Sequence, residues 1–343
     1  MIAQSSNLDV SHATFSPVRK AQKARAAHRR DATIATTTTT GPAMGGNMSA
    51  EILFITTTDA TGGRSGELER LLASIEAALA ERDWRMLLLV QHASSRRDIS
   101  GGIPANVEVE TISNQVSASR ARNLLLDEAR EQGLFVEAPL VAFPDDDCWY
   151  PQGSLDQILN LFQGDQTLDF WFCRYASTPQ SPARPLSRDV RSPSVFEVAA
   201  QASSNTMFLH SRIAEAIGGF DEELGIGTAN NGGEDTDYAL RAYRQSRKSR
   251  FVNRALIGHR DHNPRLRSRY YRGSLIAIAR HTAMRPASVA LLVRKIMVGS
   301  FLVATRDMSS QEFRTALRAA FMVGKAQTFA PAPAPPQSRG RAA

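Results

Sequence analysis

Three consecutive aspartates, Asp145, Asp146 and Asp147, are the residues of this sequence whose type and spacing point most directly to chemistry. Adjacent carboxylates repel one another, so they destabilise a fold unless a cation or several hydrogen-bond donors compensate for their charge. Oxygen ligands favour a hard divalent ion, Mg²⁺ or Mn²⁺, which can also neutralise a departing diphosphate. The alternative is a solvated acidic turn with helix-capping aspartates, and the triplet alone does not decide between the two.

A second acidic group, Glu234, Asp235 and Asp237, follows a glycine-containing loop over residues 225–233. Loops of this kind often close over substrates. A carboxylate here could take the proton from an acceptor hydroxyl that attacks a sugar anomeric carbon, as an inverting transfer requires. Taken alone, the simpler interpretation is an acidic first turn that stabilises a helix.

Two further residues have chemistry that depends on their surroundings. Arg122 lies in a short segment that begins a predicted helix, where a fixed guanidinium can bind a phosphate or hold a neighbouring carboxylate. His259 follows the last predicted strand, and a neutral imidazole can ligate Mn²⁺. Each also has an ordinary interpretation, a surface arginine at a helix start and a polar surface or hydrogen-bonded core histidine.

The elements that must position these side chains alternate between strand and helix. Apolar runs predict strands over 51–57, 86–90, 107–112, 139–143, 168–173, 205–209 and 251–257. Helical spacing of apolar residues follows most of the strands, and this alternation predicts an α/β fold with a mostly parallel sheet. The aspartate triplet comes directly after the 139–143 strand, at the sheet edge where ligands bind in open α/β folds.

Composition limits the class of protein without choosing its partner. The 343 residues are 42% hydrophobic, which is enough for one large α/β domain. A formal net charge of +7 favours anionic partners. The segment 241–272 is strongly basic, but no nucleic-acid motif accompanies it, so we expect a lipid diphosphate or membrane surface and no nucleic acid. Two cysteines do not make a disulfide scaffold or a zinc site, and a reducing cytoplasm is the simpler location.

The two ends of the chain differ from its middle. Residues 1–47 are rich in Ser, Thr, Ala and Arg and should be disordered, as should the Ala/Pro tail over 329–343. Between 276 and 328 we expect a helical extension that packs on the domain or rests on a membrane, and packing is the simpler expectation. Its most apolar run, 289–305, contains Arg294 and Lys295 at its centre, so we predict no transmembrane helix.

Five motifs taken in order carry a family resemblance. The series SASRARN, LVAFPDDDCWYP, IGGFDEELGIG, GGEDTDYALRAYR and LIGHRDH resembles the family-2 glycosyltransferases of GT-A fold over roughly residues 50–275. With YYRGSLIAIARH added, the chain most resembles the subgroup that assembles bacterial exopolysaccharides or other surface glycans. The resemblance implies a Rossmann-like GT-A domain over 48–275.

The resemblance also implies roles by position. Asp145 and Asp147 match the family's Asp-x-Asp pattern, which binds the divalent metal and neighbours the nucleotide ribose, and Asp146 lies between them in the nucleotide-sugar site. Asp235 would be the catalytic base, with Glu234 positioning the base or the acceptor. By the same resemblance, Arg122 would lie beside the nucleotide, and His259 would complete the metal site.

One position departs from the family pattern. Where members carry an acid after the second strand to read the nucleobase, this chain has Gln91 and His92, and the base is therefore open, with a UDP-sugar favoured. Thr57 and Thr58, at the end of the first strand, remain candidate contacts to the base or ribose.

The resulting expectation is a cytoplasmic inverting glycosyltransferase of hexosyltransferase type, with peripheral contact to the inner face of the plasma membrane left open. It would use a nucleoside-diphosphate sugar and a divalent metal to glycosylate a glycan or lipid-linked glycan acceptor. A metal-dependent sugar nucleotidyltransferase is one alternative, but its glycine-rich phosphate loop is only faintly present at 61–64. The other alternative is a non-catalytic glycan- or membrane-binding module, which would not need Glu234 and Asp235.

Overall fold

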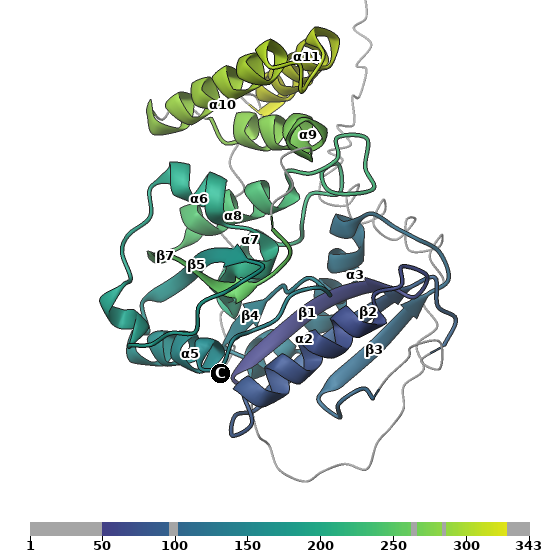
Figure 1. Cartoon of the computed structure of the whole chain (residues 1–343), viewed down its shortest axis with the longest axis vertical. Coiled ribbons are helices and arrows are strands. Elements are labelled where there is room, and N and C mark those ends of the chain that lie inside the picture. The colour runs from purple at the N-terminus through teal and green to yellow at the C-terminus, as the bar shows by residue number, and fades with distance from the viewer. Residues whose placement is uncertain (1–49, 96–101, 262–265, 283–285, 328–343) are drawn as a thin grey trace, which may run out of the picture.

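The computed structural model describes residues 50–95, 102–261, 266–282 and 286–327. Within these ranges seven strands form one sheet in the order β3-β2-β1-β4-β6-β5-β7 (Figure 1). The strands are β1 (Ile52–Asp59), β2 (Trp84–Gln91), β3 (Val107–Ile112), β4 (Leu140–Ala142), β5 (Leu168–Ala176), β6 (Met207–His210) and β7 (Lys248–Gly258). Each corresponds to one of the seven predicted apolar runs. The predicted disordered ends, 1–47 and 329–343, lie outside the described residues.

The sheet is mostly parallel, as the sequence predicts, with one exception. β1 runs parallel to β2 and β4, β2 to β3, and β5 to β7. β6 is antiparallel to both of its neighbours, β4 and β5. Phe208 pairs with Ala142 at the carboxyl end of β4, so the segment that precedes β6 lies beside the carboxyl end of β4.

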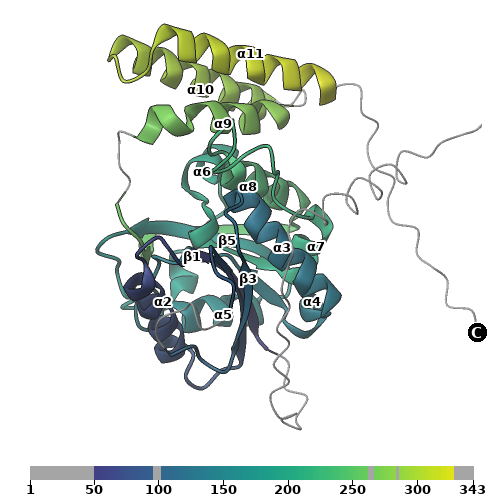
Figure 2. The ribbon, with the colours of Figure 1, turned by 90° about the vertical axis from the view of Figure 1, so that its right-hand side faces the viewer.

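Helices cover both faces of the sheet (Figure 2). One face holds α2 (Ser65–Ala78) and α5 (Ser154–Gly164), whose apolar residues share a core with the sheet. The other face holds α3 (Ala118–Glu131), α4 (Leu134–Glu137), α6 (Val195–Gln201), α7 (Ser211–Ile217) and α8 (Glu234–Gln245). β1 explains why both layers form, because its first four side chains are 0% exposed and alternate between the two cores. Burying each such side chain contributes about 1.5–3 kcal/mol.

β4 is short because of the residues that follow it. Its three residues are fully buried, and Phe143 extends the apolar run into the core. Pro144 then offers no N–H for a sheet ladder, so pairing ends there and the chain turns into the aspartate triplet. The triplet therefore lies at the carboxyl end of the central strand, as predicted.

Three further helices form a layer of their own beyond α8 (Figures 1 and 2). They are α9 (Leu266–Arg280), α10 (Pro286–Ala304) and α11 (Ser310–Gln327), and they share a third hydrophobic core. The helical character predicted for 276–328 is confirmed over the described residues. The boundary that we expect between 275 and 276 falls inside α9, which packs against α8 as well as against α11.

Candidate functional site

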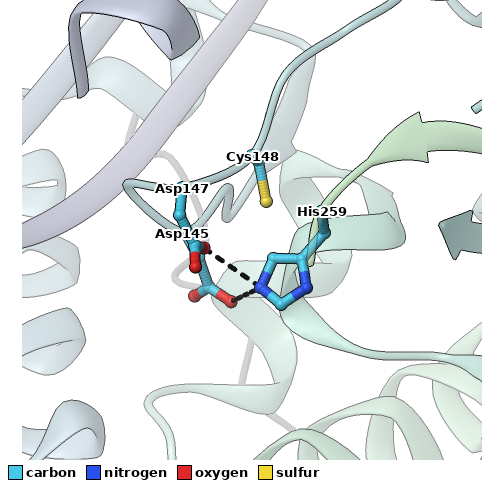
Figure 3. Close-up of side chains that lie close together, drawn as sticks. All are labelled: Asp145, Asp147, Cys148 and His259. Carbon is cyan, nitrogen blue, oxygen red and sulfur yellow. Dashed lines mark ion pairs between the residues drawn. The ribbon is translucent and has the colours of Figure 1, made fainter. Parts of the chain in front are cut away.

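The aspartate turn after β4 lies against the end of β7, the strand at one edge of the sheet. Asp145, Asp147, Cys148 and His259 point toward one another, with ligand atoms all within 4.8 Å of one another (Figure 3). His259 follows β7, and an isolated antiparallel bridge between Trp149 and Gly258 holds the two segments together. A Cβ atom at Gly258 would overlap the Trp149 ring, so glycine permits this close approach.

His259 faces both outer aspartates. Its Nε2 atom lies 3.0 Å from Oδ1 of Asp147 and 3.7 Å from Oδ2 of Asp145. Burial alone would lower the pKa of His259, but the contact with Asp147 and the charges of Asp145 and Asp147 outweigh it and raise the pKa. Burial would raise the pKa of Asp147, but His259 and the charge of Arg260 outweigh it and lower the pKa. The histidine is thus held among carboxylates, as a metal ligand would be.

A divalent ion fits this cluster. Oδ1 of Asp147 and Nε2 of His259 are both buried, face each other and have no hydrogen-bond partner among the described residues. These two buried atoms, which make no hydrogen bond, lie beside a second carboxylate, and a set of carboxylate oxygens with one imidazole nitrogen suits Mn²⁺ or Mg²⁺. Burial raises the pKa of the Cys148 thiol well above its ordinary value, so Cys148 adds a neutral sulfur atom to the set.

The middle aspartate points the other way, toward β1. Asp146 accepts hydrogen bonds from the Thr58 hydroxyl at 2.7 Å and from the Arg64 guanidinium at 2.8 Å. Burial is the largest influence on its pKa, which is raised despite these donors. Thr58 therefore belongs to the cluster. Thr57 is half-buried on the opposite face of β1, and no hydrogen bond joins its side chain to the cluster within the described residues.

Arg122 connects the aspartate turn to the second acidic group. Its guanidinium donates to Asp145 at 2.7 Å, to Ser204 at 2.9 Å and to Asp235 at 3.4 Å. Ser117 caps the first turn of α3 by accepting from the backbone N–H of Arg120, which fixes the helix start that carries Arg122. The Arg122 side chain is only 8% exposed, so its charge is tolerated because two carboxylates neutralise it.

The second acidic group forms the first turn of α8. Burial raises the pKa of Asp235, although the Arg122 charge opposes this, and Ser204 donates a hydrogen bond to its Oδ2 at 3.2 Å. Burial and then the Asp235 charge raise the pKa of Glu234 to about 7. A carboxylate with a raised pKa beside a cation is suited to accept a proton near neutral pH. Asp237, in the same turn, instead bonds Arg241 and His281 away from the site.

The start of α8 is also held from outside the sheet domain. Gly232 and Gly233 both have φ near 90°, a conformation that glycine adopts without strain. A Cβ at Gly273 of α9 would overlap the Gly232 carbonyl, and a Cβ at Gly233 would overlap the Gly273 backbone. The backbone of α9 therefore rests directly on the two residues that precede Glu234.

The structure brings together Thr58, Arg122, the aspartate triplet, Asp235 and His259, with Glu234 buried in the same helical turn as Asp235. Sequence reasoning missed Ser204, Cys148, Arg64 and Tyr175, whose ring packs edge-on against the His259 ring at 4.9 Å. Cys148 adjoins the triplet, and that adjacency was the available signal for it. Ser204 lies in an ordinary polar run, which carries no signal of its role.

The strand order, the helices on both faces and the acidic turn at the end of β4 define an α/β fold of GT-A type, as predicted. Among solved structures, this fold is similar to that of S. aureus TarS 1–349 in complex with UDP, with a TM-score of 0.50 and 14% identity over 72% of this chain and 70% of that one. TarS 1–349 in complex with UDP-GlcNAc matches with a TM-score of 0.48 and 13% identity over 81% and 90%. No protein-family model and no curated protein sequence matches the chain.

Proposed function

We propose that this chain is an inverting glycosyltransferase that moves a sugar from a nucleoside diphosphate to a hydroxyl acceptor. The observation that carries the proposal is Arg122, which joins Asp145 of the aspartate turn to Asp235 across a short buried distance. One carboxylate group can then hold the donor and metal while the other handles the acceptor proton. Both lie at the carboxyl ends of the strands, where α/β folds bind ligands.

In the proposed reaction the acceptor hydroxyl oxygen attacks the anomeric carbon and gives its proton to Asp235. The new carbon–oxygen bond forms as the bond to the diphosphate oxygen breaks, and the nucleoside diphosphate leaves with that electron pair. Attack opposite the leaving group inverts the anomeric centre. A Mn²⁺ or Mg²⁺ ion held by Asp145, Asp147 and His259 would neutralise charge on the diphosphate.

The remaining residues have roles in this proposal that follow from their contacts. Arg122 favours the charged form of the Asp235 carboxylate and fixes its position. Glu234 orients the acceptor or the base. Asp146, held by Thr58 and Arg64, lies beside the carboxyl end of β1, where we place the nucleotide ribose and base. Thr57, on the other face of β1, is a second candidate contact to the ribose or base.

A UDP-sugar is the donor that we favour, since TarS 1–349, which has a similar fold, is described in complex with UDP. The acceptor that we propose is a glycan or lipid-linked glycan of a surface polysaccharide, made at the cytoplasmic side of the membrane. A nucleotidyltransferase is less well supported, because Arg64 of the Thr61–Arg64 segment pairs with Asp146 in place of remaining available to a phosphate.

The test is donor cleavage. UDP-, GDP- and dTDP-sugars are incubated with the protein and Mn²⁺, and the released phosphate species is identified. Slow, base-selective release of a nucleoside diphosphate supports sugar transfer. In a parallel incubation with a nucleoside triphosphate and a sugar phosphate, formation of inorganic diphosphate would indicate a nucleotidyltransferase. Absence of turnover with every donor would leave a binding module.

Two variants make the donor test specific for the proposed base. Asp235→Asn should lower turnover by about 10²- to 10⁴-fold and leave UDP affinity nearly unchanged. Glu215→Gln, an exposed position on α7, is the matched control and should retain full activity. Full turnover by the Asp235→Asn variant would overturn the assignment.

A further inference from the structure

The helix α10 exposes an apolar face along its whole length. Its most hydrophobic 18-residue window has a mean hydropathy of 1.8, yet only 22% of that window is buried. The large exposed side chains along it are Val289 (43%), Val293 (51%), Met297 (66%), Val298 (38%) and Phe301 (63%). Spacings of four residues place Val293, Met297 and Phe301 on one side of the helix. We call these five residues the α10 stripe, and its continuity is unusual for a surface in contact with water alone.

Two charged side chains, Arg294 and Lys295, lie at the centre of α10. The Arg294 guanidinium lies 5.9 Å from the Phe196 ring of α6, and the Lys295 ammonium lies 5.1 Å from the Tyr271 ring of α9. Both cations therefore contact rings of neighbouring helices, although the Arg294 side chain is also exposed to solvent beside the stripe. Burial lowers the pKa of Lys295 to about 8. Arg294 and Lys295, which in the sequence argue against a transmembrane helix, do not argue against a helix that lies along a surface.

The opposite face of α10 is fixed to the protein. Leu291 and Leu302 are 4% exposed, and Leu302 belongs to the third core. Gly299 lets the Tyr271 hydroxyl approach the helix, and that hydroxyl donates to the Lys295 carbonyl at 3.0 Å. A helix that crossed a bilayer would have to leave these contacts, so a helix lying in the plane of an interface fits them better.

The helices that pack beside α10, and the turn that follows it, carry exposed basic side chains. The exposed cationic side chains of α9, α11 and the turn after α10 are Arg267, Arg269, Arg306, Arg314 and Arg318. Within the described part of the chain none of them is in an ion pair. The acids of α10, α11 and the turn between them are Asp307 and Glu312, and each accepts hydrogen bonds from a neighbouring serine or threonine hydroxyl. The exposed charge of this three-helix layer is therefore strongly positive.

The positive charge of this layer favours an anionic binding partner for the stripe. A second copy of the chain, packed face to face, would bring the same arginines together and oppose association. An anionic lipid surface attracts them. We propose that α10 docks in the plane of an anionic bilayer, with the α10 stripe between headgroups and acyl chains and the arginines over the headgroups. This surface is separate from the proposed sugar-transfer site.

The experiment is vesicle flotation of the full chain in the absence of substrates. Wild-type protein should float with vesicles of mixed phosphatidylglycerol and phosphatidylcholine, bind those of phosphatidylcholine alone at least about tenfold more weakly, and be released by salt. The triple variant Val293→Ser, Met297→Ser, Phe301→Ser should bind at least about tenfold more weakly than wild type. Because these side chains are already exposed, circular dichroism and donor cleavage should be unchanged.

A matched control and two contrary outcomes complete the design. Val136→Ser removes a side chain of α4 that is 87% exposed and should leave flotation unchanged. Equal flotation of the wild type and the triple variant would overturn the proposal. If light scattering shows that the wild type is an oligomer and the triple variant a monomer, the stripe binds a second copy of the chain and not a membrane. If alkaline carbonate does not extract the membrane-bound protein, α10 spans the bilayer. Because flotation uses no sugar donor, its failure leaves the proposed transfer activity to its own test.

Discussion

The Nε2 atom of His259 lies 3.0 Å from the Oδ1 atom of Asp147, although the two residues follow different strands, β7 and β4. Neither atom has a hydrogen-bond partner among the described residues, and both are buried. Trp149 and Gly258, one step or two along the chain from this pair, hold it in place through a backbone bridge. A divalent cation bound by both atoms would supply the partner that each of them lacks.

We therefore expect His259→Ala to weaken Mn²⁺ binding by at least about tenfold, because one of the three proposed ligands is lost. Isothermal titration of the purified protein with Mn²⁺ measures this directly. His210→Ala, a half-buried histidine at the end of β6, is the control and should bind Mn²⁺ as the wild type does. Equal Mn²⁺ affinity in all three proteins would remove His259 from the metal site.

Gly273 supports a prediction about the position of α8, the helix that carries the proposed base Asp235. A methyl group at this position would overlap the Gly232 carbonyl and push α9 away from the residues that precede Glu234. Displacement of a reacting group by about 1 Å can lower turnover 10²-fold. Gly273→Ala should therefore reduce kcat at least tenfold while the KM for donor and the UDP affinity change little.

The control for this variant lies on the same helix. Ser268→Ala adds no atom at the contact with Gly232 and should retain the wild-type kcat. Overpacking at Gly273 should also lower the free energy of unfolding by about 1–3 kcal/mol, measured with urea. A Gly273→Ala protein with normal kcat would show that α9 does not position α8.

Much of the fold could be predicted because β1, β2 and β4 are buried on both faces. Strands in that environment are continuous apolar runs, and the carboxyl ends of parallel strands are where polar side chains gather. The direction of β6 could not be predicted, because an apolar run carries no information about which end of the sheet the chain enters. Entry beside the carboxyl end of β4 reversed this strand.

The same limit explains which site residues were missed. Asp235 and His259 could be named because acidic and histidine side chains in an ordered set of motifs indicate chemistry. Ser204 contacts both Arg122 and Asp235 only because the turn before β6 enters the sheet beside β4. Nothing in its residue type or spacing shows that placement, which depends on the reversed strand.

Ser204 leads to a prediction about the pH dependence of turnover. Its hydroxyl donates to the Asp235 carboxylate, which lowers the pKa of Asp235 and partly offsets the raising effect of burial. Loss of this donor in Ser204→Ala should raise the pKa of Asp235 further. Since the base must be deprotonated, the acidic limb of the kcat/KM profile should move to higher pH.

A profile measured with saturating Mn²⁺ in both proteins checks the Ser204 prediction. The plateau above the limb should stay within about threefold of wild type, because the base is fully charged there in both proteins. A lowered plateau with an unmoved limb would indicate a structural effect of the substitution. A shift of the limb to lower pH would contradict the role given to Ser204.

Glu110 on the edge strand β3 gives a prediction about stability. Its side chain is buried, its Oε2 atom has no hydrogen-bond partner among the described residues, and Glu108 and Glu128 lie near it. Burial, then the charges of Glu128 and Glu108, raise its pKa from 4.5 to about 7. Between these two pH values the folded chain holds a proton that the unfolded chain has released, so this residue's contribution to stability falls as pH rises.

Glu110→Gln removes that titration and should stabilise the protein at pH 8 relative to wild type by on the order of 1–2 kcal/mol more than it does at pH 4.5. Urea unfolding of both proteins at the two pH values measures the difference, and groups that do not interact with Glu110 cancel because they titrate alike in both. Glu76→Gln, an exposed glutamate of α2, should give the same small change at both pH values. A pH-independent effect of Glu110→Gln would show that the folded and unfolded chains release this proton over the same pH range, and that burial does not raise the pKa of Glu110.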